Sequence, residues 1–371
     1  MPLVDVDPIT AVGRSTGVPE LDRVLGGGLV QGSATLLGGE PGIGKSTLLL
    51  QALGRMAAAG ASCLLVCGEE SKEQVRLRAE RLQTLDRNLL IVTETSLPAV
   101  LDRIIETCPD VVAVDSIQTM FDPEVGGAPG SVGQVRECAH RLVRAAKERS
   151  MATVLAFEGD RHHSLRMLHA LKHRFGTTNE LGVFEMNETG MSEVEDPSSL
   201  FLADRRPGLP GSVVTATMEG VRPLLVEVQA LVAFTSAPAA RRSARGLDSA
   251  RLDLILAVLQ SRAGRPLGGS DVYASVAGGL KVHDPGADVA IAVAVTSALT
   301  GVSLPEGLVA IGELGLGGEL RQAAQTVRRL EEAARLGFRT AIVPASTPNV
   351  DGIRLQRAEH IGTVLDSLRL V

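Results

Sequence analysis

Tryptophan is absent from this 371-residue sequence, and the other aromatic residues are few, with seven Phe and one Tyr. The hydrophobic cores must therefore be aliphatic, and a surface that stacks nucleic-acid bases would have few rings to use. No stretch approaches 18 uncharged apolar residues, which excludes a membrane-spanning helix on sequence grounds. The first residues lack the basic region and apolar run of a secretory signal peptide, so we expect a cytoplasmic protein without a membrane partner.

Cysteine is also scarce. The four cysteines are Cys63, Cys67, Cys108 and Cys138, and no two of them form a CxxC pair. A structural zinc site needs such closely spaced ligands, so the sequence does not favour one. We expect four reduced thiols in the core.

The net charge is −6, from 37 basic and 43 acidic side chains. This balance argues against a protein coated in positive charge, but affinity for nucleic acid depends on charges near the phosphates rather than on the total. Residues 161–174 contain four Lys or Arg, four of the seven histidines and no acid. This basic segment is therefore a candidate for local contact with DNA.

Short apolar runs alternate with amphipathic stretches in the first 160 residues. This pattern predicts βα units and a mostly parallel sheet, hence an α/β fold. The expected strands are 33–38, 63–68, 89–92, 111–115 and 152–157, and the expected helices are 46–59, 72–82, 97–108 and 134–149. A loop rich in Gly and Pro at 121–133 reads as unsupported and mobile.

The length suits two domains rather than one. Residues 183–232 read as strands and turns, and small and basic residues at 236–250 suggest a linker. A second α/β region should follow, with helices near 252–262, 287–300 and 323–336 and a strand at 340–344.

The strongest motif is a GxxxxGKS sequence that begins at Gly39. It lies between an expected strand and an expected helix, which is the context that this phosphate-binding loop requires. Its glycines let backbone N–H groups surround phosphates, and the helix N-terminus adds a favourable dipole. We expect Lys45 to bridge the β- and γ-phosphates of ATP and Ser46 to ligate Mg²⁺. The nucleotide-binding residues are expected to be Gly39, Glu40, Pro41, Gly42, Ile43, Gly44, Lys45, Ser46 and Thr47.

Acidic residues follow two of the expected strands. Asp115 ends an apolar strand and is expected to hold Mg²⁺ together with Ser46. Glu69 and Glu70 follow another strand, at the edge of the sheet where ligands bind in parallel α/β folds. We interpret Glu69 as the general base that polarises the attacking water. A solvated loop that caps a helix is the alternative.

The basic segment ends in the sequence KHRFG, which starts at Lys172. A solvated basic turn is one interpretation of it, and its histidines suggest no metal. The DNA-binding candidates are Arg161, Arg166 and Lys172, with Arg241, Arg242 and Arg245 as lesser ones.

The motifs in combination resemble the bacterial RadA (Sms) family of DNA-repair ATPases. The resemblance rests on STGVPELD from Ser15, the phosphate-binding loop, GEES from Gly68, DSIQT from Asp115 and KHRFG. It implies a RecA-like core followed by a domain shaped like the Lon peptidase domain. The domains are then a lead-in at 1–15, the ATPase at 16–235, the linker at 236–250 and the Lon-like domain at 251–371. By resemblance, Lys172 and Arg174 reach the ATP of the neighbouring subunit in a homo-oligomeric ring, a hexamer.

The sequence departs from the family pattern in three places. It contains no four-cysteine zinc finger, with which the family usually opens. His173 stands where the family has Asn. The strand that begins at Ala152 runs directly into Phe157-Glu-Gly-Asp, so a segment that the family carries between Val154 and Phe157 is missing. This segment is implicated in sensing the γ-phosphate and in binding DNA.

In the C-terminal region, the resemblance to Lon places Gly286 at the position of the serine nucleophile and Val327 at the position of its lysine partner. Neither can perform that chemistry. The domain is therefore expected to serve assembly and DNA contact rather than proteolysis.

The resemblance implies a DNA-dependent ATPase that uses ATP and Mg²⁺, moves along single-stranded DNA and drives branch migration of recombination intermediates, with a RecA-type recombinase as partner. One alternative is a KaiC-like switch whose ATP state controls protein partners. A second alternative, an ATP-dependent protease, is disfavoured by Gly286 and Val327.

Overall fold

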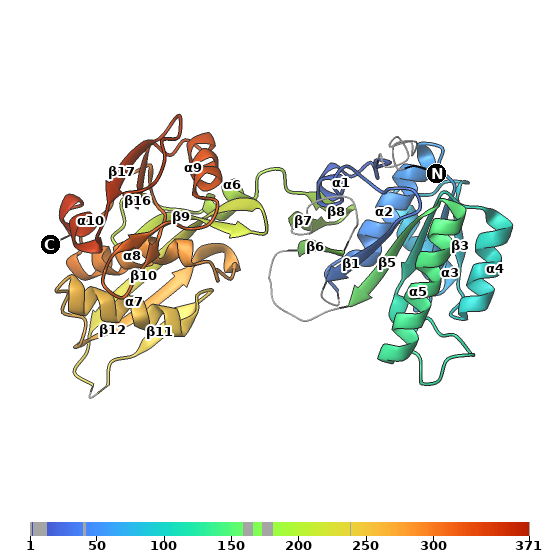
Figure 1. Ribbon diagram of the computed structural model, residues 1–371, viewed down its shortest axis with the longest axis horizontal. Coiled ribbons are helices and arrows are strands. Elements are labelled where there is room, and N and C mark those ends of the chain that lie inside the picture. Colours follow the sequence, from blue (N-terminus) through green and yellow to red (C-terminus); the bar gives the residue numbers. More distant parts are fainter. Residues whose placement is uncertain are drawn as a thin grey trace. The chain divides into compact units, whose positions relative to one another are not determined.

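The computed structural model describes residues 2, 13–39, 42–158, 166–172, 181–237 and 239–370. The chain forms two compact units, Met1–Glu195 and Asp196–Val371 (Figure 1). Each unit is an α/β structure built on its own sheet, so the expected fold class is confirmed.

The first unit alternates strands and helices much as the sequence predicts. A short helix, α1 (Pro19–Val24), precedes the sheet. The strands are β1 (Ala34–Gly39), β2 (Cys63–Cys67), β3 (Leu89–Val92), β4 (Val111–Asp115), β5 (Ala152–Glu158), β6 (Arg166–Lys172), β7 (Leu181–Asn187) and β8 (Gly190–Glu193). The helices are α2 (Lys45–Ala58), α3 (Lys72–Arg81), α4 (Leu97–Thr107) and α5 (Val132–Arg149).

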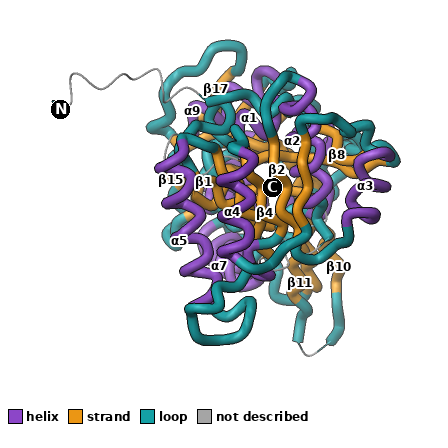
Figure 2. Tube along the Cα trace, turned by 90° about the vertical axis from the view of Figure 1, so that its right-hand side faces the viewer, coloured by secondary structure: helices purple, strands orange, loops and turns teal. Residues whose placement is uncertain are grey.

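The strands form one sheet in the order β3-β2-β4-β5-β1-β6-β7-β8. The first five are parallel, and β6, β7 and β8 add antiparallel pairs. Side chains alternate across a strand. Cys63 and Leu65 of β2 therefore pack with α2 and α3, whereas Leu64 and Val66 pack with α4 and α5. Figure 2 shows α3 and α5 on opposite sides of β2 and β4.

The second unit is built on a seven-stranded sheet. Its strands in spatial order are β11 (Arg242–Arg245), β12 (Ser270–Val276), β10 (Arg222–Phe234), β9 (Ser212–Glu219), β13 (Leu308–Ala310), β16 (Thr340–Pro344) and β17 (Arg354–Ala358). The hairpin β14 (Glu313–Leu314) and β15 (Leu320–Arg321) stands apart from this sheet. The helices are α6 (Pro197–Leu202), α7 (Ser249–Arg262), α8 (Asp288–Thr300), α9 (Thr326–Arg335) and α10 (Ile361–Ser367).

This sheet corrects the domain boundary that the sequence suggested at residues 235–236. The hairpin β9–β10 pairs with β12 and β13, so it belongs to the second unit and the division falls between Glu195 and Asp196. Residues 236–250 are not a linker between the units. They include β11, which pairs in parallel with β12 of the second unit, and the first two residues of α7.

Two further expectations differ from the structure. Cys63, Cys67 and Cys138 are buried free thiols, but Cys108 is exposed at the end of α4. The loop at 121–133 is supported rather than free, because Gln134 Nε2 donates to the carbonyl of Val125 at 2.6 Å and the buried Asp122 pairs with Arg141. Among the described residues, no helix is long and apolar enough to cross a membrane.

Candidate functional site

The phosphate-binding loop joins β1 to α2, as the sequence predicts. Gly42 and Gly44 have φ of +76° and +106°, in the left-handed region that glycine adopts without strain. Gly44 is the N-cap of α2, so the N–H groups of the first turn face the loop. Lys45, the first residue of the helix, is only 5% exposed. Glu40 and Pro41 lie outside the described residues.

Asp115 ends β4 at the same edge of the sheet. The Ser46 hydroxyl is hydrogen-bonded to its carboxylate, so the two residues expected to hold Mg²⁺ meet although they lie far apart in sequence. Burial raises the pKa of Asp115, and the negative charges of Glu69 and Glu70 raise it further. A cation beside this carboxylate would relieve that desolvation. Oxygen ligands of this kind suit Mg²⁺, so both residues fit the ion.

The GEES segment directly follows β2, whose last residue, Cys67, pairs with Asp115. The Ser116 hydroxyl donates a hydrogen bond to Glu69 Oε1 at 2.9 Å. Glu70, in contrast, forms an ion pair with Arg78 of α3. The structure therefore brings Glu69, Asp115 and the phosphate-binding loop to one edge of the sheet.

Gly68 allows this close approach. A Cβ built on Gly68 would lie 2.1 Å from Thr119 Oγ1, so a larger residue would push the GEES segment away from the turn after β4. Gly68 N also donates to the carbonyl of Asp115 at 3.1 Å.

Sequence reasoning missed two residues of this arrangement, Ser116 and Arg78. Ser116 is signalled only by its position directly after Asp115. Arg78 lies eight residues after Glu70, on a helix whose start is fixed by a capping box between Ser71 and Gln74. Neither signal is specific, because the contacts depend on how β2, β4 and α3 pack.

Comparison with known proteins confirms the family that the sequence motifs resemble. Residues 14–107 match the family described as "ATPase: KaiC". The DNA repair protein RadA of Listeria monocytogenes is 45% identical over 367 residues, which covers 92% of this chain and 80% of the relative. RadA of Bacillus subtilis is 44% identical, with 93% and 81% covered. RadA of Mycolicibacterium smegmatis is 42% identical over 398 residues, with 100% and 85% covered.

The chain belongs to the RadA family. Its first unit is accordingly an ATPase unit that binds ATP. The alignment with the Mycolicibacterium relative spans 398 positions against the 371 residues of this chain, so at least 27 aligned positions have no residue here.

Only the middle of the basic segment of this RadA-family chain lies within the described residues. Its described part, residues 166–172, is strand β6 inside the sheet. Arg166 and Lys172 stand at opposite ends of β6, six residues apart, a distance of about 20 Å along an extended strand. Arg161 and Arg174 lie outside the described residues.

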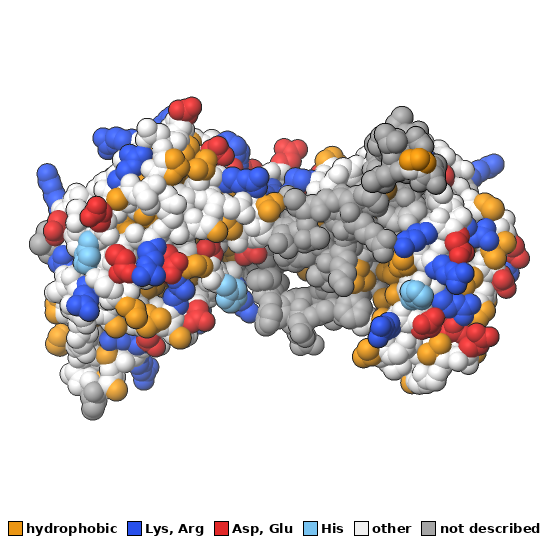
Figure 3. All heavy atoms as spheres, viewed as in Figure 1, with side chains coloured by type: hydrophobic (Ala, Val, Ile, Leu, Met, Phe, Trp, Pro, Cys, Tyr) orange, Lys and Arg blue, Asp and Glu red, His pale blue; other side chains and the backbone are white. Residues whose placement is uncertain are grey.

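The three arginines of the second unit also differ from one another. The Arg242 guanidinium donates to the carbonyls of Ser270, at 2.8 Å, and Leu267, at 3.3 Å. It therefore ties β11 to the start of β12 and is only partly exposed. Arg241 and Arg245 are exposed. On the face drawn in Figure 3, basic and acidic side chains are interspersed over the described surface of both units. No broad basic face is visible among the described residues on that side.

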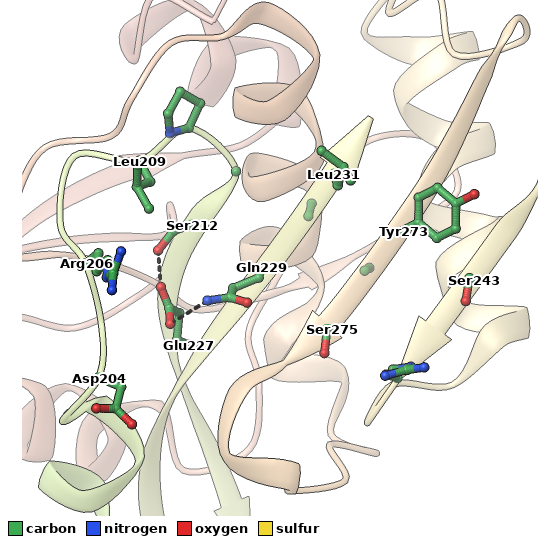
Figure 4. Close-up of a pocket in the computed structure, with 15 residues that line it drawn as sticks. Asp204, Arg206, Leu209, Ser212, Glu227, Gln229, Leu231, Ser243, Tyr273 and Ser275 are labelled. Carbon is green, nitrogen blue, oxygen red and sulfur yellow. Dashed lines mark hydrogen bonds between the residues drawn. The ribbon is translucent and has the colours of Figure 1, made fainter. Parts of the chain in front are cut away.

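Arg245 lines a hollow of about 640 Å³ on the sheet of the second unit (Figure 4). Glu227 lies on its floor, 3% exposed, and accepts hydrogen bonds from Ser212 and from Gln229 Nε2, the latter at 3.0 Å. Asp204 and Arg206 line the same hollow. The lining thus contains as many acidic residues as arginines, two of each, so the hollow is not a basic channel.

Residues 275–347 match the family described as "ChlI: Subunit ChlI of Mg-chelatase". In this region Gly286 and Val327 occupy the two positions that the Lon resemblance assigns to peptidase chemistry. A Cβ on Gly286 would lie 2.7 Å from Arg329 Nη1 and 2.9 Å from the Cβ of Ala323. Arg329 is 1% exposed and pairs with Asp284. The guanidinium therefore fills the space that a serine side chain would need.

Proposed function

We propose that this chain is a DNA-dependent ATPase of DNA repair. The observation that carries the proposal is the arrangement at one edge of the first sheet, where the phosphate-binding loop, the Ser46–Asp115 pair and the Glu69–Ser116 pair lie together. Lys45 contacts the β- and γ-phosphates of ATP, and Glu69 accepts a proton from the attacking water. Ser46 and Asp115 hold Mg²⁺, which when bound neutralises charge on the phosphate oxygens.

The test is ATP turnover by the Lys45→Ala variant with saturating Mg²⁺ and ATP. Lys45 acts on charge that grows in the transition state, so its loss should abolish turnover while the protein stays folded. Lys147→Ala, at an exposed lysine of α5, is the control and should retain full turnover. Turnover of Lys45→Ala within about tenfold of the parent chain would contradict the assignment of the phosphate-binding loop.

We also propose that Lys172 and Arg174 act on the ATP of a neighbouring subunit in a ring, a hexamer by resemblance to the family. The register of β6 supports action in trans. Lys172 pairs with Leu36, three residues before the end of β1, and β6 runs antiparallel to β1. The chain therefore leaves β6 in the direction away from the edge that carries its own phosphate-binding loop.

Mixing two inactive variants tests this proposal. Arg174→Ala should bind ATP but hydrolyse it slowly, since arginine fingers contribute about 10³–10⁵ in turnover in GTPases. In rings that mix Arg174→Ala and Lys45→Ala subunits, some subunit boundaries pair the intact phosphate-binding loop of the first variant with the intact arginine of the second. ATP turnover should therefore partly return. Subunit exchange is checked by fluorescence transfer between labelled chains. Exchange without recovery would contradict action in trans.

The relatives are named DNA repair proteins, and we propose the same role here: movement along single-stranded DNA that promotes branch migration of recombination intermediates, with a RecA-type recombinase as partner. The match to a KaiC family supports a second candidate, an ATP-driven switch that acts on protein partners. Stimulation of ATP turnover by single-stranded DNA separates the two, because the switch predicts none. The buried Arg329 beside Gly286 supports the proposal that the second unit has no peptidase activity.

A further inference from the structure

Two adjacent acids at the ATP site have different partners. Glu70 is half-buried and forms an ion pair with Arg78, so one of its oxygens is already held by a guanidinium. Glu69 is exposed, and its Oε1 accepts the hydroxyl of Ser116 at 2.9 Å. A hydroxyl holds a carboxylate in place without neutralising its charge.

Ser116 is itself firmly placed. It is 2% exposed and directly follows the metal-holding Asp115. Its carbonyl accepts a hydrogen bond from Thr119 Oγ1 at 2.8 Å, and Thr119 in turn lies against Gly68. The short helical turn Ile117–Thr119 therefore fixes the Ser116 hydroxyl relative to the end of β4.

We propose that Ser116 is a positioning residue for ATP hydrolysis, which orients the Glu69 carboxylate toward the attacking water. The inference rests on the proposed function, in which Glu69 is the general base. A glutamate side chain has three rotatable bonds, and a bond from a fixed, buried hydroxyl removes much of that freedom. Arg78 keeps Glu70 out of this role by pairing with it.

The first test compares Ser116→Ala with the parent chain in kcat, KM for ATP and affinity for a non-hydrolysable ATP analogue. Misplacement of a catalytic group by about 1 Å lowers rates by up to ~10²-fold, so we expect kcat to fall about 10- to 100-fold. KM and analogue affinity should change less than about twofold. Ser116 acts through Glu69, so the contacts that bind ATP equally well before and during the reaction are unchanged. A fall in analogue affinity as large as the fall in kcat would overturn the proposal.

Thr153→Val is the matched control, because Thr153 is a fully buried hydroxyl of the same sheet, on β5. It should leave kcat unchanged. Thermal unfolding of both variants shows whether they fold as the parent does. Ser116→Thr restores a hydroxyl and should recover at least part of the lost kcat. A Ser116→Thr variant that folds normally but is as slow as Ser116→Ala would contradict a role for the hydroxyl.

A double-mutant cycle separates this proposal from the function on which it rests. Glu69→Gln alone should lower kcat about 10²–10⁴-fold, the usual contribution of a general base. If Glu69→Gln keeps full turnover, the assignment of the base fails. If Glu69→Gln is slow and Ser116→Ala slows it by the same factor as in the parent chain, only the positioning role of Ser116 fails. We expect Ser116→Ala to have almost no further effect in the Glu69→Gln background.

Discussion

Replacing Arg329 by methionine should destabilise the second unit far more than the same change at Arg328, its neighbour on α9. Arg329 is 1% exposed, whereas Arg328 is exposed. Arg329 pairs with Asp284, and its guanidinium also donates to the carbonyls of Ala216 at 2.6 Å and Ala324 at 2.8 Å. Methionine can fill part of the volume but can satisfy none of these oxygens.

Removal of one partner from a buried ion pair costs about 3–5 kcal/mol, because the other charge is left uncompensated. In a domain of this size, 1 kcal/mol corresponds to about 2–4 °C in Tm, so Arg329→Met should lower the transition of the second unit by about 6–20 °C. Arg328→Met should change the free energy of unfolding by less than about 0.5 kcal/mol.

The assay is differential scanning calorimetry of the full chain, with urea unfolding as a second measurement. Asp284→Asn combined with Arg329→Met should lose less stability than the two single changes together, since the carboxylate that Arg329 neutralises is then gone. Equal transitions for Arg328→Met and Arg329→Met would refute the account of a guanidinium packed beside Gly286.

Four further substitutions test particular residues. Asp115→Asn should abolish turnover yet raise the Tm of the first unit in metal-free buffer, because burial raises the pKa of Asp115 and its charged form opposes folding at neutral pH. Burial and the charge of Asp284 raise the pKa of Glu219 from 4.5 to about 7, so the free energy of unfolding should fall as pH rises between those values, and Glu219→Gln should flatten this dependence in urea titrations. Arg245→Gln should weaken single-stranded DNA binding and reduce the salt slope by about 0.7, measured by fluorescence anisotropy, whereas Arg242→Gln should reduce stability instead.

The first unit could be predicted from the sequence because its signals are local. A strand, a glycine-rich loop and a helix in succession define the ATP site, and β1 and α2 lie within one residue of their expected ends. Asp115 was identified in the same way, as a carboxylate that ends an apolar strand. These residues reach one edge because parallel strands align their carboxyl ends.

The features that the sequence did not predict depend on contacts between segments that are distant in the chain. The residues after Glu195 signal only the start of a short helix, and the domain boundary follows instead from the pairing of β9 and β10 with β12 and β13. In the same way, Arg242 reads as a solvated basic residue until β11 is placed beside β12. The filled space beside Gly286 appears only when α9 packs on the sheet and brings Arg329 against it.

The most direct test of the central claim is steady-state phosphate release by the full chain with and without single-stranded DNA, at several salt concentrations. A DNA-dependent ATPase predicts turnover that rises with DNA, falls back as salt weakens the phosphate contacts, and is absent in Lys45→Ala under every condition. Turnover in the parent chain that is the same with and without DNA would contradict the claim and favour the switch that acts on protein partners.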